Sequence, residues 1–121
     1  MKNMKRRTIW ISFTIILLLV LAPAAGASAA ETKVIKMTAQ KYEFMPETIE
    51  VGLGDTVVLE ITATDTDHGF GLSAFDIDRN IPEGETVRIE FVADKKGEFT
   101  FSCTKFCGWG HFGMSGKLIV S

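Results

Sequence analysis

The chain has 121 residues, with 13 basic and 15 acidic side chains, two cysteines and two histidines. Four of the basic residues lie in the first seven positions, so residues 30–121 carry nine basic against 15 acidic side chains. This acidic balance argues against a nucleic-acid partner. It either favours docking to a basic protein surface or simply keeps a small protein soluble. About 92 residues suffice for one domain with a modest core, but not for two.

The first 29 residues have the pattern of a secretion signal. Basic residues between Lys2 and Arg7 precede an apolar run of 14 residues at positions 9–22, and Ala27-Ser28-Ala29 has the form of an A-x-A cleavage site. The run is short for a membrane span, which needs about 20 residues. We expect a signal peptide at 1–29 and a domain at 30–121 in the periplasm or another extracytoplasmic compartment. The alternative is an uncleaved membrane anchor over residues 9–25.

The remaining sequence predicts strands and no helix. Apolar-rich or alternating runs indicate strands at residues 34–39, 49–51, 57–62, 87–92, 99–103 and 116–120. Clusters of glycine, proline and acidic residues indicate turns at 52–54, 81–85 and 94–97. Residues 63–67 form a polar loop that leads to His68. Short strands separated by such turns predict an all-β sandwich.

The stretch from Cys103 to Met114 has the pattern C-x3-C-x3-H-x2-M and holds both cysteines and one of the two histidines. The other histidine, His68, lies 35 residues before Cys103. Thiolate, imidazole and thioether donors together favour copper, because zinc does not use methionine and calcium and magnesium prefer oxygen. Two cysteines this close could instead form a disulfide in an exported protein. Soft donors gathered at ligand spacing favour the metal site.

This motif, read as C-x3-C-G-x-G-H-x2-M with an upstream His-Gly-Phe at 68–70, resembles the CuA domain of cytochrome c oxidase subunit II. The C-terminal domain of nitrous oxide reductase carries a similar site. The resemblance covers nearly all of the chain after residue 31. It implies a cupredoxin-like Greek-key β-sandwich, in which the loop between the last two strands supplies most of the copper ligands.

The same resemblance implies a dinuclear centre of two copper ions. Cys103 and Cys107 would bridge the two coppers, and His68 and His111 would each bind one of them. Two weak ligands would complete the site. Met114 would bind the copper that carries His68, and the backbone carbonyl of Lys105 would bind the copper that carries His111. The side chain of Lys105 is then expected to point into solvent.

With both histidines committed as ligands, no set of nucleophile, base and acid remains, so we expect an electron carrier and not an enzyme. By resemblance, a c-type cytochrome or similar protein would donate electrons, a terminal oxidase or reductase would accept them, and a copper-delivery chaperone would load the site. The chain could act as an accessory subunit of an oxidase. Three departures from oxidase subunit II favour a stand-alone carrier. The chain has a single short N-terminal segment in place of a membrane hairpin, and only Tyr42 and Phe44 where subunit II has an aromatic-rich stretch. Position 105 is lysine, where oxidases commonly have glutamate.

Two other functions compete with this one. A periplasmic copper chaperone or copper-storage protein would have an open, methionine-rich site, whereas the chain after residue 30 has only Met37 and Met45 outside the motif. A purely structural domain would join Cys103 to Cys107 in a disulfide. Trp109 also has two candidate roles, which are packing over the metal or forming an apolar contact patch with Phe106 and Phe112.

Overall fold

The computed structural model describes residues 29–121. The predicted signal segment therefore lies outside the described residues, except for Ala29. Within the described part, no helix is long and apolar enough to cross a membrane.

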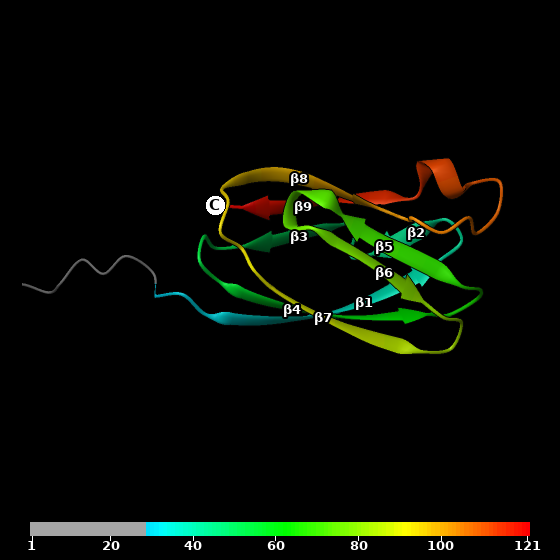
Figure 1. The fold of residues 1–121 in the computed structure, drawn as a ribbon, viewed down its shortest axis with the longest axis horizontal. Coiled ribbons are helices and arrows are strands. Elements are labelled where there is room, and N and C mark those ends of the chain that lie inside the picture. Colours follow the sequence, from blue (N-terminus) through cyan, green and yellow to red (C-terminus); the bar gives the residue numbers. More distant parts are fainter. Residues whose placement is uncertain (1–28) are drawn as a thin grey trace, which may run out of the picture.

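Two β-sheets face each other in a sandwich (Figure 1). The four-stranded sheet has the order β2-β1-β4-β7, and the five-stranded sheet has the order β3-β9-β8-β5-β6. The first sheet contains β1 (Thr32–Gln40), β2 (Glu43–Met45), β4 (Thr56–Ala63) and β7 (Thr86–Val92). The second contains β3 (Thr48–Val51), β5 (His68–Leu72), β6 (Ile77–Ile81), β8 (Gly97–Ser102) and β9 (Ser115–Val120). The only helical pieces in residues 29–121 are two short 3-10 turns, η1 (Ser73–Phe75) and η2 (His111–Gly113). The prediction of an all-β sandwich is confirmed.

The chain passes repeatedly from one sheet to the other, so strands that are neighbours in sequence are often not neighbours in space. Strand β1 pairs in parallel with β4, and β3 pairs in parallel with β9, while the other pairs are antiparallel. The alternating residues Val57, Leu59 and Ile61 of β4 are buried, as their period of two predicts. Val58, which that pattern assigned to the polar face, is also buried.

Three phenylalanines from three strands form the centre of the core. Phe44, Phe70 and Phe101 are fully buried, with ring centroids 5.2–5.7 Å apart. Phe70 follows His68 by two residues on β5, and Phe101 precedes Cys103 by two residues at the end of β8. Side chains two apart on a strand share a face. Two of the core rings therefore lie two residues from two of the candidate ligands.

The loop that joins β8 to β9 lies at the end of the sandwich opposite the C-terminus (Figure 1). Its two ends are held together, because Ser102 pairs with Ser115 and the amide of Cys103 donates a hydrogen bond to the carbonyl of Met114 at 3.0 Å. The first and last soft donors of the motif are thus brought to the base of one closed loop.

Candidate metal centre

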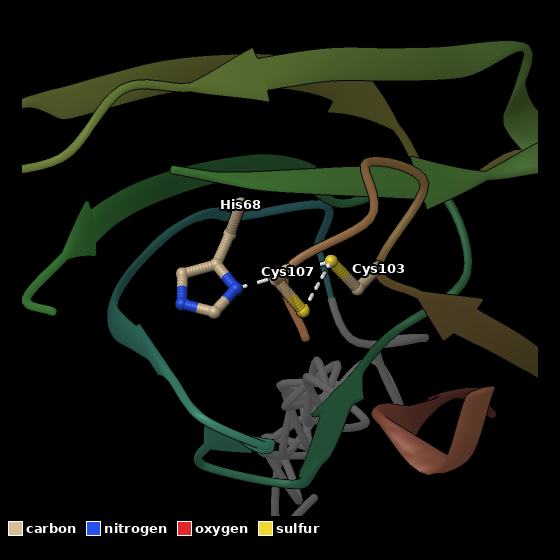
Figure 2. Close-up of side chains that lie close together, drawn as sticks. All are labelled: His68, Cys103 and Cys107. Carbon is tan, nitrogen blue, oxygen red and sulfur yellow. Dashed lines mark hydrogen bonds between the residues drawn. The ribbon is translucent and has the colours of Figure 1, made fainter. Parts of the chain in front are cut away.

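The two cysteine sulfurs form the middle of the candidate site. Their Sγ atoms lie 3.5 Å apart, both thiols are free, and both residues are buried. The alternative of a Cys103–Cys107 disulfide is therefore not the state of this structure. His68, from the start of β5, places its Nδ1 atom 3.9 Å from the sulfur of Cys103, and it is fully buried (Figure 2). Candidate ligand atoms of these three residues all lie within 4.8 Å of one another.

The other three predicted donors each contact one of the two sulfurs. The Nδ1 atom of His111 lies 3.7 Å from Cys107 Sγ, and Met114 Sδ lies 3.8 Å from the same sulfur. The carbonyl oxygen of Lys105 lies 3.1 Å from Cys103 Sγ, which donates a hydrogen bond to it. All six predicted donors are thus gathered around the sulfur pair. Since a bridging sulfur would touch both metal ions, the assignment of each weak ligand to a particular copper stays a prediction.

Burial changes the proton affinity of Cys107. Burial, with a further contribution from its hydrogen bond with Cys103, raises the pKa of the Cys107 thiol to about 11. At neutral pH this thiol is therefore protonated in the metal-free protein. It must release its proton to become a metal ligand, because the thiolate is the form that binds metal.

The orientation of His68 is set by Asp65, a residue that the sequence analysis did not single out. One carboxylate oxygen of Asp65 lies 2.8 Å from Nε2 of His68, and the other accepts the backbone N–H of Lys41 at 2.7 Å. A ring nitrogen that donates to a carboxylate leaves the other nitrogen free as a ligand. Burial favours a higher pKa for Asp65, but the Lys41 amide and the His68 ring outweigh it and lower that pKa. The sequence signal was an aspartate three residues before the histidine.

Asp67, in the same segment between β4 and β5 as Asp65, contacts the β8–β9 loop that carries the cysteines. Asp67 accepts the backbone N–H of Glu83 at 2.8 Å with one oxygen, and it pairs with Lys105 Nζ at 3.0 Å with the other. The Glu83 amide and then Lys105 lower the pKa of Asp67. The Lys105 side chain is exposed, as expected, and its ammonium is in addition held in an ion pair with Asp67.

Tyr42 packs against the glycines of the metal-site loop. A β-carbon at either Gly108 or Gly110 would overlap the Tyr42 ring, and Gly108 also has a φ of 134°, which side-chain-bearing residues rarely adopt. A similar close approach occurs at Gly69, where a β-carbon would overlap Thr104 of the loop. The C-G-x-G-H spacing thus lets the backbone pass directly under an aromatic ring.

Two exposed aromatic side chains flank His111 at the surface, and a third packs against one of them. Trp109 is 89% exposed, Phe112 84% and Phe106 59%. The rings of Phe112 and Phe106 lie 5.2 Å and 5.7 Å from the His111 ring, and Trp109 packs edge-on against Phe106 at 6.0 Å. Of the two candidate roles of Trp109, its exposure favours the apolar contact patch over packing across the metal. We call Phe106, Trp109 and Phe112 the aromatic patch.

The donor set as a whole fits copper. It combines two thiols, two imidazoles, one thioether and one carbonyl, and sulfur and imidazole donors of this kind select copper over calcium or magnesium. Among residues 29–121, His68, Cys103 and Cys107 form the only compact group of three or more His, Cys, Asp or Glu side chains at metal-binding distances.

Comparisons with known proteins identify the family. A family model described as a cupredoxin-like domain matches residues 11–120. The chain is 32% identical to cytochrome c oxidase subunit 2 of Thermus thermophilus over 79 residues, which cover 65% of the chain and 58% of that protein. It is 32% identical to nitrous-oxide reductase of Ralstonia nicotianae over 90 residues, which cover 71% of the chain and 14% of that enzyme. The chain thus spans less than two thirds of either relative.

A solved structure has the same fold. The periplasmic domain of cytochrome oxidase subunit II of Bradyrhizobium japonicum superimposes with a TM-score of 0.67 at 21% identity, covering 73% of the chain and 83% of that domain.

Proposed function

This chain belongs to the cupredoxin-like domain family, and from that premise we propose that it binds copper in the centre described above and transfers single electrons. The observation that carries the proposal is the pair of free, buried thiols 3.5 Å apart, each with an imidazole nitrogen within 4 Å. Copper bound there would supply a one-electron redox couple. The relationship to cytochrome c oxidase subunit 2 and nitrous-oxide reductase supports the same chemistry.

We propose that the centre holds two copper ions. Two thiolates that can each bridge, with one imidazole on either side, provide two similar donor sets. A mononuclear blue-copper site would use one cysteine with two histidines and a methionine, and it would leave the second buried thiol without a role. His68, His111, Cys103 and Cys107 would be the strong ligands, with Met114 and the Lys105 carbonyl as weak ones.

The protein residues would keep the ligands in place while the charge of the site changes. His68 is held by Asp65, and the loop ends are hydrogen-bonded to each other. Phe70 and Phe101 of the buried core cluster lie two residues from His68 and Cys103 in the chain. A pre-organised, dry donor set changes little on gain or loss of an electron, and the surrounding apolar side chains tune the potential. No base or nucleophile is assigned to the site, so we propose a carrier and not a catalyst.

Electron exchange with partners would occur at the aromatic patch. His111 is a half-buried ligand, and Phe106 and Phe112 of the patch flank it, so a partner docked there comes close to the centre. A c-type cytochrome or similar donor and an oxidase or reductase acceptor are the partner classes that the relationship suggests, in an extracytoplasmic compartment. The acidic balance of residues 30–121 would favour basic partners.

The burial of the donors argues against the alternative of a copper chaperone or storage protein. His68 and Met114 are almost fully buried, and the cysteines are nearly so. A protein that releases copper needs donors that an acceptor can reach, whereas a carrier needs donors that exclude water.

Copper loading of the reduced protein tests the proposed function. We expect two coppers per chain, a purple colour, and an electron spin resonance spectrum in which one unpaired electron is shared between two coppers. Cys107→Ser is the matched control, which should bind at most one copper and lose the shared spectrum. A blue protein that saturates at one copper would show a mononuclear site. Rapid loss of all copper to a weak chelator would favour the chaperone.

A further inference from the structure

The loop between β4 and β5 carries two aspartates that are bound in the same way. Asp65 uses one oxygen on the Lys41 amide and the other on His68, and Asp67 uses one oxygen on the Glu83 amide and the other on Lys105. Each carboxylate is thus anchored on the backbone of a distant turn, and its free oxygen holds a residue of the candidate metal centre. The two halves of the centre, one on β5 and one on the β8–β9 loop, meet at this short segment.

We propose that Asp67 is a positioning residue for the metal centre and acts through Lys105, as an anchored carboxylate that ties the cysteine-bearing loop to the segment carrying His68. This inference rests on the proposed function only for its effect on copper.

The ion pair can influence the metal centre because of where Lys105 lies in the chain. Lys105 lies between the two cysteines, and its carbonyl oxygen is 3.1 Å from Cys103 Sγ. Its ammonium is 3.0 Å from Asp67, which immediately precedes His68 in the chain. Holding the side chain therefore restricts where the carbonyl lies relative to the sulfurs and to the histidine.

The β8–β9 loop is also held at Thr104, the residue before Lys105. Thr104 donates its hydroxyl hydrogen bond to Asp78 of β6 at 2.7 Å, and it packs against Gly69 and Gly71 of β5. Residues 104 and 105 are thus both fastened to the five-stranded sheet or its loops, whereas Phe106 projects into solvent. Both contacts are exposed, and in the Asp67–Lys105 pair each side chain is about half exposed.

If Lys105 acts only through its charge, removing that charge should have the opposite effect on the rate of copper release from the effect expected if Lys105 positions the loop. A positive charge beside the centre repels copper ions, so its removal in Lys105→Gln would slow copper release if charge were the whole effect. If the ion pair positions the loop, the same substitution speeds copper release. Asp67→Asn keeps an oxygen for the Glu83 amide but removes the charge that holds Lys105, so on the positioning argument it has the same effect as Lys105→Gln.

The test is a double-mutant cycle with Asp67→Asn, Lys105→Gln and both together, and with Lys105→Arg as the conservative variant. Copper release to a competing chelator is measured at low and high salt. We expect each single variant to release copper about two- to fivefold faster at low salt, as for an exposed ion pair. The double variant should match the singles, Lys105→Arg should match the unmodified protein, and about 1 M salt should remove the difference. Slower release from Lys105→Gln, or additive effects of the two substitutions, would overturn the proposal.

A second measurement does not need copper and so separates this inference from the proposed function. Backbone order parameters of residues 104–106 in the reduced, metal-free protein should fall in both single variants and fall no further in the double variant. Lys117→Gln and Glu98→Gln, which break a surface pair on β8 and β9, are the controls and should leave these values unchanged. Unchanged order parameters in Asp67→Asn would overturn the proposal even if the protein binds copper. Failure to bind copper with lowered order parameters would instead overturn only the proposed function.

Discussion

At the scale of single residues, the proposed ligands differ in how strongly they should bind the metal. His111 and His68 each place Nδ1 within 4 Å of a cysteine sulfur, and Met114 contacts one sulfur through its polarizable thioether. A thioether is a weak ligand that mainly tunes the potential, whereas imidazoles hold the metal.

Met114→Leu and His111→Ala should therefore have different consequences. We expect Met114→Leu to keep two coppers and the shared-electron spectrum, with a changed reduction potential. We expect His111→Ala to lose copper affinity by more than the about 10- to 100-fold that removal of an outer-shell partner costs. Metal analysis and voltammetry of both variants make the comparison. Loss of the spectrum in Met114→Leu but not in His111→Ala would contradict the ligand assignment.

The raised pKa of Cys107 should make the metal-free protein less stable in alkali. Folding raises this pKa from 9.0 to about 11, so the folded state keeps a proton that the unfolded state loses. The resulting stability is fully present below pH 9 and is lost as the pH rises through 11. Denaturant unfolding of the reduced protein at pH 7 and pH 11 should show a loss of about 2 kcal/mol that Cys107→Ser does not show. An equal loss in both proteins would assign the effect to other groups.

At the scale of elements, strands β5 and β8 support the centre through their phenylalanines. Phe101 contacts both Phe44 and Phe70 and is fully buried, so Phe101→Ala leaves a cavity in the core two residues before Cys103. We expect a loss of about 3–5 kcal/mol in the free energy of unfolding. Phe99→Ala, on the same strand but only partly buried, should cost less. Denaturant unfolding of the metal-free variants measures both, and equal losses would show that Phe101 is not a central core residue.

The sequence predicted most strands, and it missed β2, β5 and β6 for identifiable reasons. Strand β2 has three residues, which is too short to show a period. Strand β5 contains Gly69 and Gly71, which indicate a loop locally, but they are needed because Thr104 packs against them. Strand β6 is polar because it lies at the edge of its sheet, where side chains face solvent. In each case, the reason for the strand is a tertiary contact.

In the candidate site, too, some residues could be predicted from the sequence and others depend on tertiary contacts. Five of its six donors could be proposed from the sequence, because four lie in one stretch of 12 residues and the fifth is the only other histidine. The sixth, the Lys105 carbonyl, followed only from the family resemblance. The partners that hold those donors could not be proposed. Asp65 and Asp67 both lie within three residues of His68, but this spacing does not show which of them binds the histidine. Asp67 and Tyr42 reach the ligand loop through contacts between different turns, which linear spacing does not reveal.

At the scale of the whole molecule, the site lies at one pole of the sandwich and the C-terminus at the other (Figure 1). Strand β9 alone extends for about 20 Å between the metal-site loop and the last residue. The rate of electron tunnelling falls exponentially with distance, so electron transfer to the proposed centre should be much faster from the metal-site end than from the C-terminal end. A protein fastened to an electrode through Ser121 would hold its centre away from the conductor. One resting on the exposed ring of Trp109 would hold it close. The rate of electron exchange with an electrode would therefore depend on which end of the protein faces the electrode.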